Sequence, residues 1–432
     1  MAGSAFAPWR ILCAAIAATV LAHDAAPAAD YELLSAVVVS RHGVRSPIAT
    51  GMPLAEIAAD PWPAWPTAHP GDLTERGAEL AKLMGAYYRD YYVVQGLFPA
   101  QSCPTPDTVV FWADVDQRTK VTAQALSDGM FPGCGIQPGH LADAKADPLF
   151  HPPRAGVCTI DAELARRSVM RRIGSLRRLQ SSVRPEIAAM QAVLKCCAPA
   201  LCRPTGAAAC KLGDLQTELV AHGDEGVWLR GPISIGSMAG EVFLLQYAQN
   251  MPAEQVAWGR VRTQQALRPL MRLHTLRFDL MNRTPYLAAR EGSALVERIV
   301  STFRRFLSTG GASSPKLTVL VGHDTNISQI GGMLGLHWSL PSYLPDQTPP
   351  AGALHFELLR ERRTGLHSVR VSYVAQTPDQ MRQATPLDRS RRPERSVARI
   401  DDCRTGRAGC PWPRFARLAE RSIDRACVPV AR

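Results

Sequence analysis

The sequence predicts an α/β fold in which a mostly parallel sheet is covered by helices on both faces and a smaller all-α lid domain is inserted. Three apolar runs, "LLSAVVVS", "TVVFWA" and "LTVLV", are continuous rather than alternating, as is typical of strands buried on both faces. Helical patterns lie between these runs, and a repeated strand–loop–helix order indicates an α/β architecture. Residues 160–281 show helical spacing and few strand signals, so the lid is expected there, between α/β segments 30–159 and 282–432.

The first two predicted strands each lead into polar residues and then a predicted helix. The first strand ends at Arg41, and "TERGAELAKLMGAYYRDYY" from Thr74 onward has apolar residues at helical spacing, with Gly96 as a stop signal. The second strand is Thr108–Ala113, and Asp116 is placed to cap the helix that follows it.

The third predicted strand, Leu317–Val321, leads directly into Gly322, His323 and Asp324. Either Asp324 or Thr325 is placed to cap a helix over "NISQIGGMLGL". Strand-like character returns afterwards in "ALHFELLR" and "HSVRVSYVAQ", so further strands are expected near the end of the chain.

The first 28 residues are predicted to be a cleaved secretory signal. Arg10 precedes the apolar run "ILCAAIAATVLA", and small residues near Ala26 to Ala28 form an A-x-A-like cleavage site. The alternative is a short buried helix. The run is too short to span a bilayer, so a periplasmic or secreted protein without a membrane anchor is expected.

Cysteine usage agrees with export. Cys13 lies in the predicted signal, and an even number of cysteines remains, which indicates disulfides in an exported chain. Two close pairs, Cys202 with Cys210 and Cys403 with Cys410, are each placed to close a short loop. No two histidines lie within five positions and no pair of CxxC motifs occurs, so no metal site is predicted.

The chain is basic, with 49 Lys and Arg against 38 Asp and Glu, a formal charge of +11. Two arginine clusters, "RRSVMRRIGSLRRL" and "RSRRPER", contribute to this excess. Such runs are usually solvated surface; the alternative is a field that attracts a polyanionic substrate. The expected partner is a small anionic molecule bound by a monomer, not nucleic acid or a membrane.

Polar and charged groups gather where the three strands end. In an open α/β sheet, ligands bind outside the carboxyl ends of the strands. Arginine donors match phosphate oxygens in bidentate fashion, and several arginines converge favourably only around an anion. The sequence therefore predicts a site for a phosphoryl group, built from Arg41, His42, Arg45, Arg118, His323 and Asp324.

The histidines and the aspartate suggest transfer of the phosphoryl group as well as binding. A neutral imidazole is a nucleophile toward phosphorus, and surrounding arginines keep its pKa low and stabilise charge on the phosphoryl oxygens. Asp324 is placed to protonate a leaving alkoxide. Each residue alone has a structural account: His323 could end a strand, Asp324 could be only an N-cap, and Arg118 could be a surface arginine.

"RHGVRSP" with the distant "GHDTN" resembles the histidine acid phosphatases, a branch of the phosphoglycerate-mutase-like superfamily that includes bacterial periplasmic phytases and acid glucose-1-phosphatases. Further similar segments, such as "LTERGAEL", "ADVDQRT", "DPLFHP" and "DQTPPAG", spread the resemblance over nearly the whole mature chain. The resemblance implies the same discontinuous α/β domain with a helical lid.

Residue roles follow from the resemblance. It implies His42 as the nucleophile and Asp324 as the proton donor to the leaving group, with no metal or other cofactor. The phosphate would be held by Arg41, Arg45, Arg118 and His323, and the substrate pocket would be lined by Thr325 and Met238. It also implies the disulfides Cys103–Cys134, Cys158–Cys427, Cys202–Cys210 and Cys403–Cys410, which leaves Cys196 and Cys197 unassigned.

The resemblance leaves the substrate open. The similar phytases carry a lysine shortly after RHGxRxP that contacts a distal phosphate, whereas this chain has Ala49 there, closer to the glucose-1-phosphatase pattern. The expected activity is a phosphomonoesterase that acts on phytate, sugar phosphates or both. The alternatives are a sugar phosphatase with little phytase activity and a non-catalytic phosphate- or polyanion-binding protein. A cytosolic mutase is disfavoured by the signal and by Asp324.

Overall fold

The computed structural model describes residue 1 and residues 30–430, apart from 49–53, 106, 143, 207–208, 223–225, 313, 402 and 404–408. The predicted signal beyond Met1, and Ala49, which was expected to affect substrate choice, lie outside the described residues. Within the described part, no helix has the length and apolar character needed to cross a membrane.

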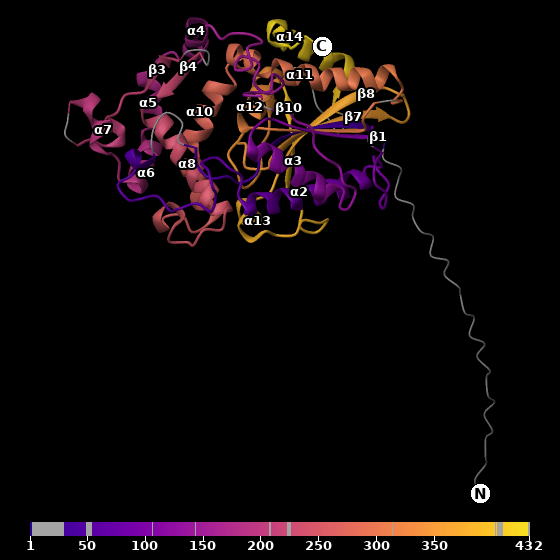
Figure 1. Ribbon diagram of the computed structural model, residues 1–432, viewed down its shortest axis with the longest axis horizontal. Helices are drawn as coiled ribbons and strands as arrows, with labels where there is room; N and C mark the ends of the chain where they lie inside the picture. Colours follow the sequence, from indigo (N-terminus) through magenta and orange to yellow (C-terminus); the bar gives the residue numbers. More distant parts are fainter. Residues whose placement is uncertain are drawn as a thin grey trace.

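A seven-stranded sheet lies in one half of the molecule, beside the helical layer (Figure 1). Its strand order is β11-β8-β7-β1-β5-β2, with β9 added on β8. The three strands that lead into the site motifs are β1 (Tyr31–Arg41), β2 (Val109–Ala113) and β5 (Leu317–Gly322). β5 lies between the other two and is parallel to both. The predicted parallel strands are therefore neighbours, and their carboxyl ends meet at one edge of the sheet.

The other half of the sheet is antiparallel. β7 (Ala353–Glu361) pairs antiparallel with β1 and with β8 (His367–Ala375), and β8 pairs antiparallel with β9 (Glu394–Val397) and β11 (Cys410–Pro411). The expectation of a parallel sheet thus holds for the strands that carry the site motifs and not for these four. The reason is local: residues 362–366 connect β7 to β8 directly, and so short a connection joins only antiparallel strands.

Helices cover both faces of the sheet, as predicted (Figure 1). One face packs against α2 (Glu75–Val94) and α3 (Gln117–Met130). The other packs against α11 (Pro285–Ser308), α12 (Asp324–Leu334) and α14 (Trp412–Ser422). Side chains of β1 alternate between the two cores, because successive residues of a strand point to opposite faces. Burial on both faces explains why this strand reads as an unbroken apolar run.

The loop after β1 is held against the start of α2. Thr74 caps α2 by accepting a hydrogen bond from the backbone N–H of Gly77. A Cβ atom at Gly43 would lie 2.7 Å from the carbonyl oxygen of Gly77, so only glycine fits in this loop. The glycine of "RHGVRSP" therefore fixes the residues on either side of it.

The elements from α4 to α10 form a second layer beside one end of the sheet (Figure 1). Within it, α8 is buried on every side, as expected of a helix that is apolar all round. Its core also receives Ile57 and Trp62 from the first segment of the chain. The helices are α4 (Ala162–Ile173), α5 (Leu176–Ser182), α6 (Arg184–Leu194), α7 (Pro199–Cys202), α8 (Pro232–Ala248), α9 (Gln264–Leu270) and α10 (Arg272–Asn282).

The prediction that this layer is all-α is wrong in one respect, because it contains a hairpin of β3 (Glu218–Ala221) and β4 (Val227–Arg230). In β4, Val227 and Leu229 are buried while the residues between and after them are not. Four residues give too short an alternation to stand out from a helical pattern. The domain bounds remain a prediction.

Four short elements lie in the connections: α1 (Leu54–Ile57), α13 (Pro378–Gln383) and the pair β6 (Leu336–His337) with β10 (Arg399–Ile400). The four disulfides implied by the resemblance are all present. A fifth joins the neighbours Cys196 and Cys197, which the sequence left unassigned.

Candidate active site

The pocket lies where the carboxyl ends of β1, β2 and β5 face the helical layer. The register of β1 and β5 pairs Arg41 with Gly322, and the N–H of His42 donates to the Gly322 carbonyl at 2.9 Å. The two motifs are therefore fastened together at the backbone, and the rings of His42 and His323 lie 5.5 Å apart. The cavity has a volume of about 570 Å³, and β4, α8 and α10 supply its opposite wall.

Arg41 lies behind the pocket and is fully buried. Its Nη1 donates to the Thr348 carbonyl at 2.6 Å, and its Nη2 contacts the carboxylates of Asp324, at 3.0 Å, and Glu241. Burial disfavours the charged guanidinium, but these two carboxylates more than offset it and raise its pKa. Arg41 is thus a fixed cation that orients two carboxyl groups.

Arg45 and Arg118 face the pocket directly. Arg45 Nη1 donates to the Ser46 carbonyl at 2.9 Å; burial lowers its pKa to about 10, so it stays charged in acidic and neutral solution. Arg118 Nη2 pairs with Asp116 at 2.6 Å. Within the described part of the chain, Nε of each of these arginines, and of Arg41, is buried without a hydrogen-bond partner. Buried N–H donors without a protein partner are available to bind an anion.

His42 offers one particular nitrogen to the pocket. Its Nδ1 lies 2.9 Å from the carbonyl oxygen of Gly43, and because a carbonyl only accepts, Nδ1 carries the hydrogen. Nε2 then holds the free lone pair. Burial, followed by the charges of Arg41, Arg118 and Arg45, holds the pKa of His42 well below its usual value. The neutral, nucleophilic form of the imidazole therefore persists to lower pH than in an ordinary histidine.

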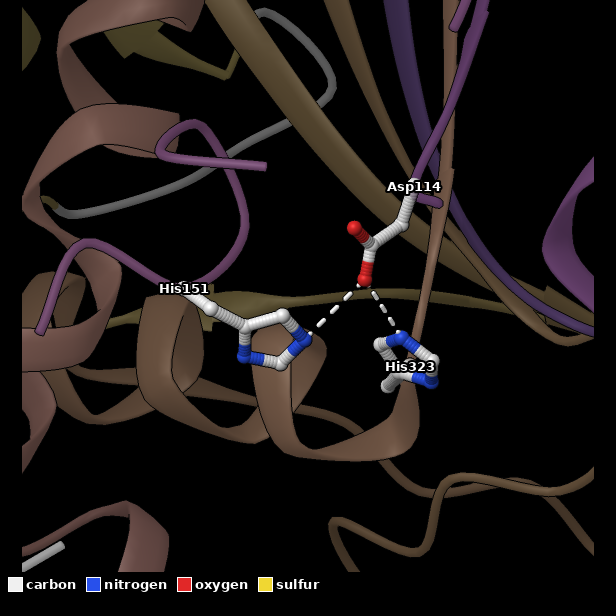
Figure 2. A group of neighbouring side chains, drawn as sticks. All are labelled: Asp114, His151 and His323. Atoms are coloured by element: carbon white, nitrogen blue, oxygen red, sulfur yellow. Dashed lines mark hydrogen bonds and ion pairs between the residues drawn. The ribbon is translucent and has the colours of Figure 1, made fainter. Parts of the chain in front are cut away.

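His323 belongs to a group of three side chains (Figure 2). Its Nε2 lies 2.8 Å from Oδ2 of Asp114, and Nε2 of His151 lies 3.0 Å from the same oxygen. The Nδ1 of His323 faces Arg118 Nη2 at 3.5 Å. Burial by itself raises a carboxyl pKa, but the hydrogen bonds from His151 and His323 bring that of Asp114 far below its usual range.

The spacing of residues in the sequence did not suggest a metal site, yet the fold brings Asp114, His151 and His323 together. Among the residues that the structure describes, this is a group whose ligand atoms lie within 4.8 Å of one another. The sequence missed it because its members come from three separate segments. The 2.8 Å and 3.0 Å separations from one carboxylate oxygen are hydrogen-bond distances, so the group is explained as a shared hydrogen bond.

Asp324 begins α12 at the pocket wall. Its Oδ1 accepts from the N–H of Thr325 at 2.8 Å. Burial raises its pKa, but Arg41, Arg45, His274 and His323 outweigh burial and lower it. A phosphoryl dianion among the same arginines would offset their field and favour the protonated carboxyl, the form that donates a proton.

Glu241 is a site residue that the sequence analysis missed. It lies on α8, is 7% exposed, and contacts Arg41 Nη2 while its Oε1 lies 3.9 Å from Arg45 Nη2. The available signal was a single glutamate inside the apolar stretch "AGEVFLLQ", since an unpaired buried charge is too costly to persist. Other missed pocket residues are Asp116, His151, Arg154, Trp228, Arg230, His274, Arg277 and Phe278.

The structure brings the predicted residues together. Arg41 lies behind the pocket in contact with Asp324, and every other predicted residue lines the cavity: His42, Arg45, Arg118, Met238, His323, Asp324 and Thr325. Met238 lies on α8, one turn before Glu241, so both side chains belong to the wall opposite the strand ends.

The fold and the pocket define a class of protein: an α/β protein that gathers arginines and a neutral histidine at the strand ends to hold an anionic group. A model of the histidine phosphatase superfamily (branch 2) matches residues 32–374, and the chain belongs to this family. It is accordingly a phosphatase of the histidine acid phosphatase type.

The chain is 34% identical to phytase AppA of Escherichia coli K12 over 409 residues, which cover 92% of this chain and 94% of that protein. It is 31% identical to a glucose-1-phosphatase of Salmonella typhimurium LT2, covering 94% of this chain and 97% of the relative. A solved structure of Hafnia alvei phytase in complex with tartrate superposes with a TM-score of 0.85 at 37% identity, covering 94% of this chain and 100% of that one.

Proposed function

We propose that the protein hydrolyses phosphate monoesters through a phosphohistidine formed on His42. The observation that supports this proposal most directly is the tautomer of His42. Its Nδ1–H donates to the Gly43 carbonyl, so Nε2 is the nitrogen free to attack within an arginine-lined pocket. A non-catalytic anion-binding protein has no use for a lone pair directed in this way.

In the first step, Nε2 attacks phosphorus and forms an N–P bond while the P–O bond to the leaving group breaks. The alcohol departs with a proton from Asp324. Arg41, Arg45 and Arg118 stabilise the charge on the phosphoryl oxygens. In the second step, water attacks phosphorus and the N–P bond breaks, the Asp324 carboxylate accepts the proton of that water, and inorganic phosphate leaves.

The proposed substrates are phytate and sugar phosphates. Both activities appear in the names of relatives, and Hafnia alvei phytase, whose structure was also solved with myo-inositol hexakis sulphate, matches with a TM-score of 0.83. The pocket is also lined by Arg154, Arg230 and Arg277, which supports a polyanionic substrate. A glucose-1-phosphatase with little phytase activity is the second candidate, favoured by Ala49 in place of a lysine.

Periplasmic or secreted localisation and a monomeric state are part of the proposal. Five disulfides within the described chain support an oxidising compartment, and the apolar run after Arg10 supports a secretory signal.

The test is to trap the intermediate. The enzyme is mixed with ³²P-labelled phosphate ester, quenched in alkali, in which phosphohistidine survives, and digested for mass spectrometry. Label on the peptide that contains His42 is expected. Turnover of p-nitrophenyl phosphate without label at His42 would overturn the mechanism and leave the phosphatase activity standing.

A further inference from the structure

His151 and His323 compete for one carboxylate oxygen. Both donate from Nε2 to Oδ2 of Asp114, at 3.0 Å and 2.8 Å, while Oδ1 accepts from the N–H of Val115 at 2.8 Å (Figure 2). His151 comes from a loop after α3, lines the pocket, and its side chain is 20% exposed against 8% for His323. The two rings lie 5.2 Å apart.

The protonation of His323 decides whether it can hold a phosphoryl group. Its Nε2–H is already donated to Asp114, so Nδ1, which faces Arg118 Nη2 at 3.5 Å, is the nitrogen left to contact a ligand. A neutral ring presents a lone pair at Nδ1, which repels a phosphoryl oxygen. The imidazolium presents an N–H at that position and adds a positive charge, so the charged form of His323 is the one that can donate to a phosphoryl oxygen.

One carboxylate fully compensates only one imidazolium. Around His151, Asp114 and Glu291 favour the cation and Arg154 opposes it. Around His323, Asp114, Asp116 and Asp324 favour the cation, and the opposing charges are His151, Arg118 and the nearby His42 when protonated. Burial lowers the pKa of both rings. At His151 the hydrogen bond to Asp114 outweighs burial and raises the pKa, whereas that of His323 stays lowered, with the charge of His151 among the causes.

We propose that His151 is a positioning residue that competes with His323 for the charge of Asp114, and thereby lowers the pH above which His323 stops donating to the phosphoryl group. The inference rests on the proposed function for its effect on turnover. The competition itself is a property of the three side chains.

The test replaces His151 by asparagine, which removes the competing charge. The alkaline limb of the kcat/KM profile, and that of inhibition by inorganic phosphate, should move up by about one to two pH units, as expected for removing a cation whose ring lies 5.2 Å away in a largely buried site. His151→Lys keeps a positive charge and should leave the limb near that of the wild type. His140→Asn, at an exposed histidine outside the pocket, is the matched control.

A second measurement reads His323 directly. In protein labelled with ¹⁵N-histidine, the ring signals of His323, assigned with a His323→Asn sample, should titrate at higher pH in His151→Asn than in the wild type. An unchanged or lower titration would overturn the inference. If this shift occurs while no variant, including the wild type, hydrolyses phosphate esters, the competition stands and the proposed function fails. If turnover is retained without the shift, the competition fails and the proposed function stands.

Discussion

The two walls of the pocket are built in different ways. The sheet wall consists of residues at strand ends whose backbones are fastened by the β1–β5 register and by the His42 N–H bond to Gly322. The helical wall consists of side chains from β4, α8 and α10, such as Trp228, Met238 and Arg277, which reach in from a separate core. The sheet wall can therefore hold atoms at reacting distance, while the helical wall can vary to suit the rest of the substrate.

Glu241 connects the two walls. It projects from α8 but contacts Arg41 at the end of β1, so a carboxylate of the helical wall orients a cation of the sheet wall. The comparison therefore predicts large, substrate-independent losses for changes in the sheet wall, intermediate losses at Glu241, and selective losses for changes in the helical wall.

The largest expected effect is that of His42→Ala. Removing the nucleophile should reduce kcat about 10³-fold or more, on every substrate alike, while orthovanadate still binds because the arginines remain. Steady-state kinetics on p-nitrophenyl phosphate and phytate, with vanadate binding by calorimetry, check this. Activity within tenfold of the wild type would remove His42 from the mechanism.

Next is Asp324→Asn, which removes the proton donor without removing the side-chain volume. A sugar alkoxide needs the proton far more than p-nitrophenolate does, so kcat on glucose 1-phosphate should fall about 10²-fold or more and kcat on p-nitrophenyl phosphate much less. The ratio of the two rates is the measurement. Equal losses on both substrates would assign Asp324 only to orienting Arg41.

Glu241→Gln should act on both walls at once. Arg41 would stay buried with one carboxylate fewer, so the free energy of unfolding should fall by about 2–4 kcal/mol, and kcat/KM should fall about 10-fold or more on all substrates. Urea denaturation and kinetics test the two effects. The matched control is Glu186→Gln, whose partner Arg272 is exposed, where a change of at most about 1 kcal/mol is expected.

The smallest and most selective effect is expected from Arg277→Ala on the helical wall. Arg277 lines the helical wall of the pocket and its charge acts on Asp324, so its loss should raise KM for phytate roughly tenfold, the size of one charge-assisted contact, and change p-nitrophenyl phosphate hydrolysis much less. Arg272→Ala, at an exposed arginine of the same helix, should change neither. An equal loss of kcat/KM on both substrates would show that the helical wall does not act selectively on the larger substrate.

Local sequence predicted an element correctly where one segment contains the whole pattern that identifies it. "VVVSRHGVRSP" predicted a buried strand that ends in ligand-binding groups, and Arg41, His42 and Arg45 lie at the end of β1. The helical pattern from Thr74 onward was predicted in the same way, and α2 begins at Glu75. The short hairpin β3–β4 was missed, because four residues per strand carry too little periodicity to be recognised.

The sequence by itself determined the α/β class, the strand ends that carry the chemistry, and the residues that resemble a histidine acid phosphatase. Only the tertiary structure decided which nitrogen of His42 is free, that Glu241 reaches Arg41, and that His151 shares Asp114 with His323. The physical reason is that periodicity and motifs are properties of neighbouring residues, whereas a hydrogen bond between residues 114, 151 and 323 depends on how distant segments pack. The charge balance of the pocket, and with it the pKa of each group, exists only after that packing.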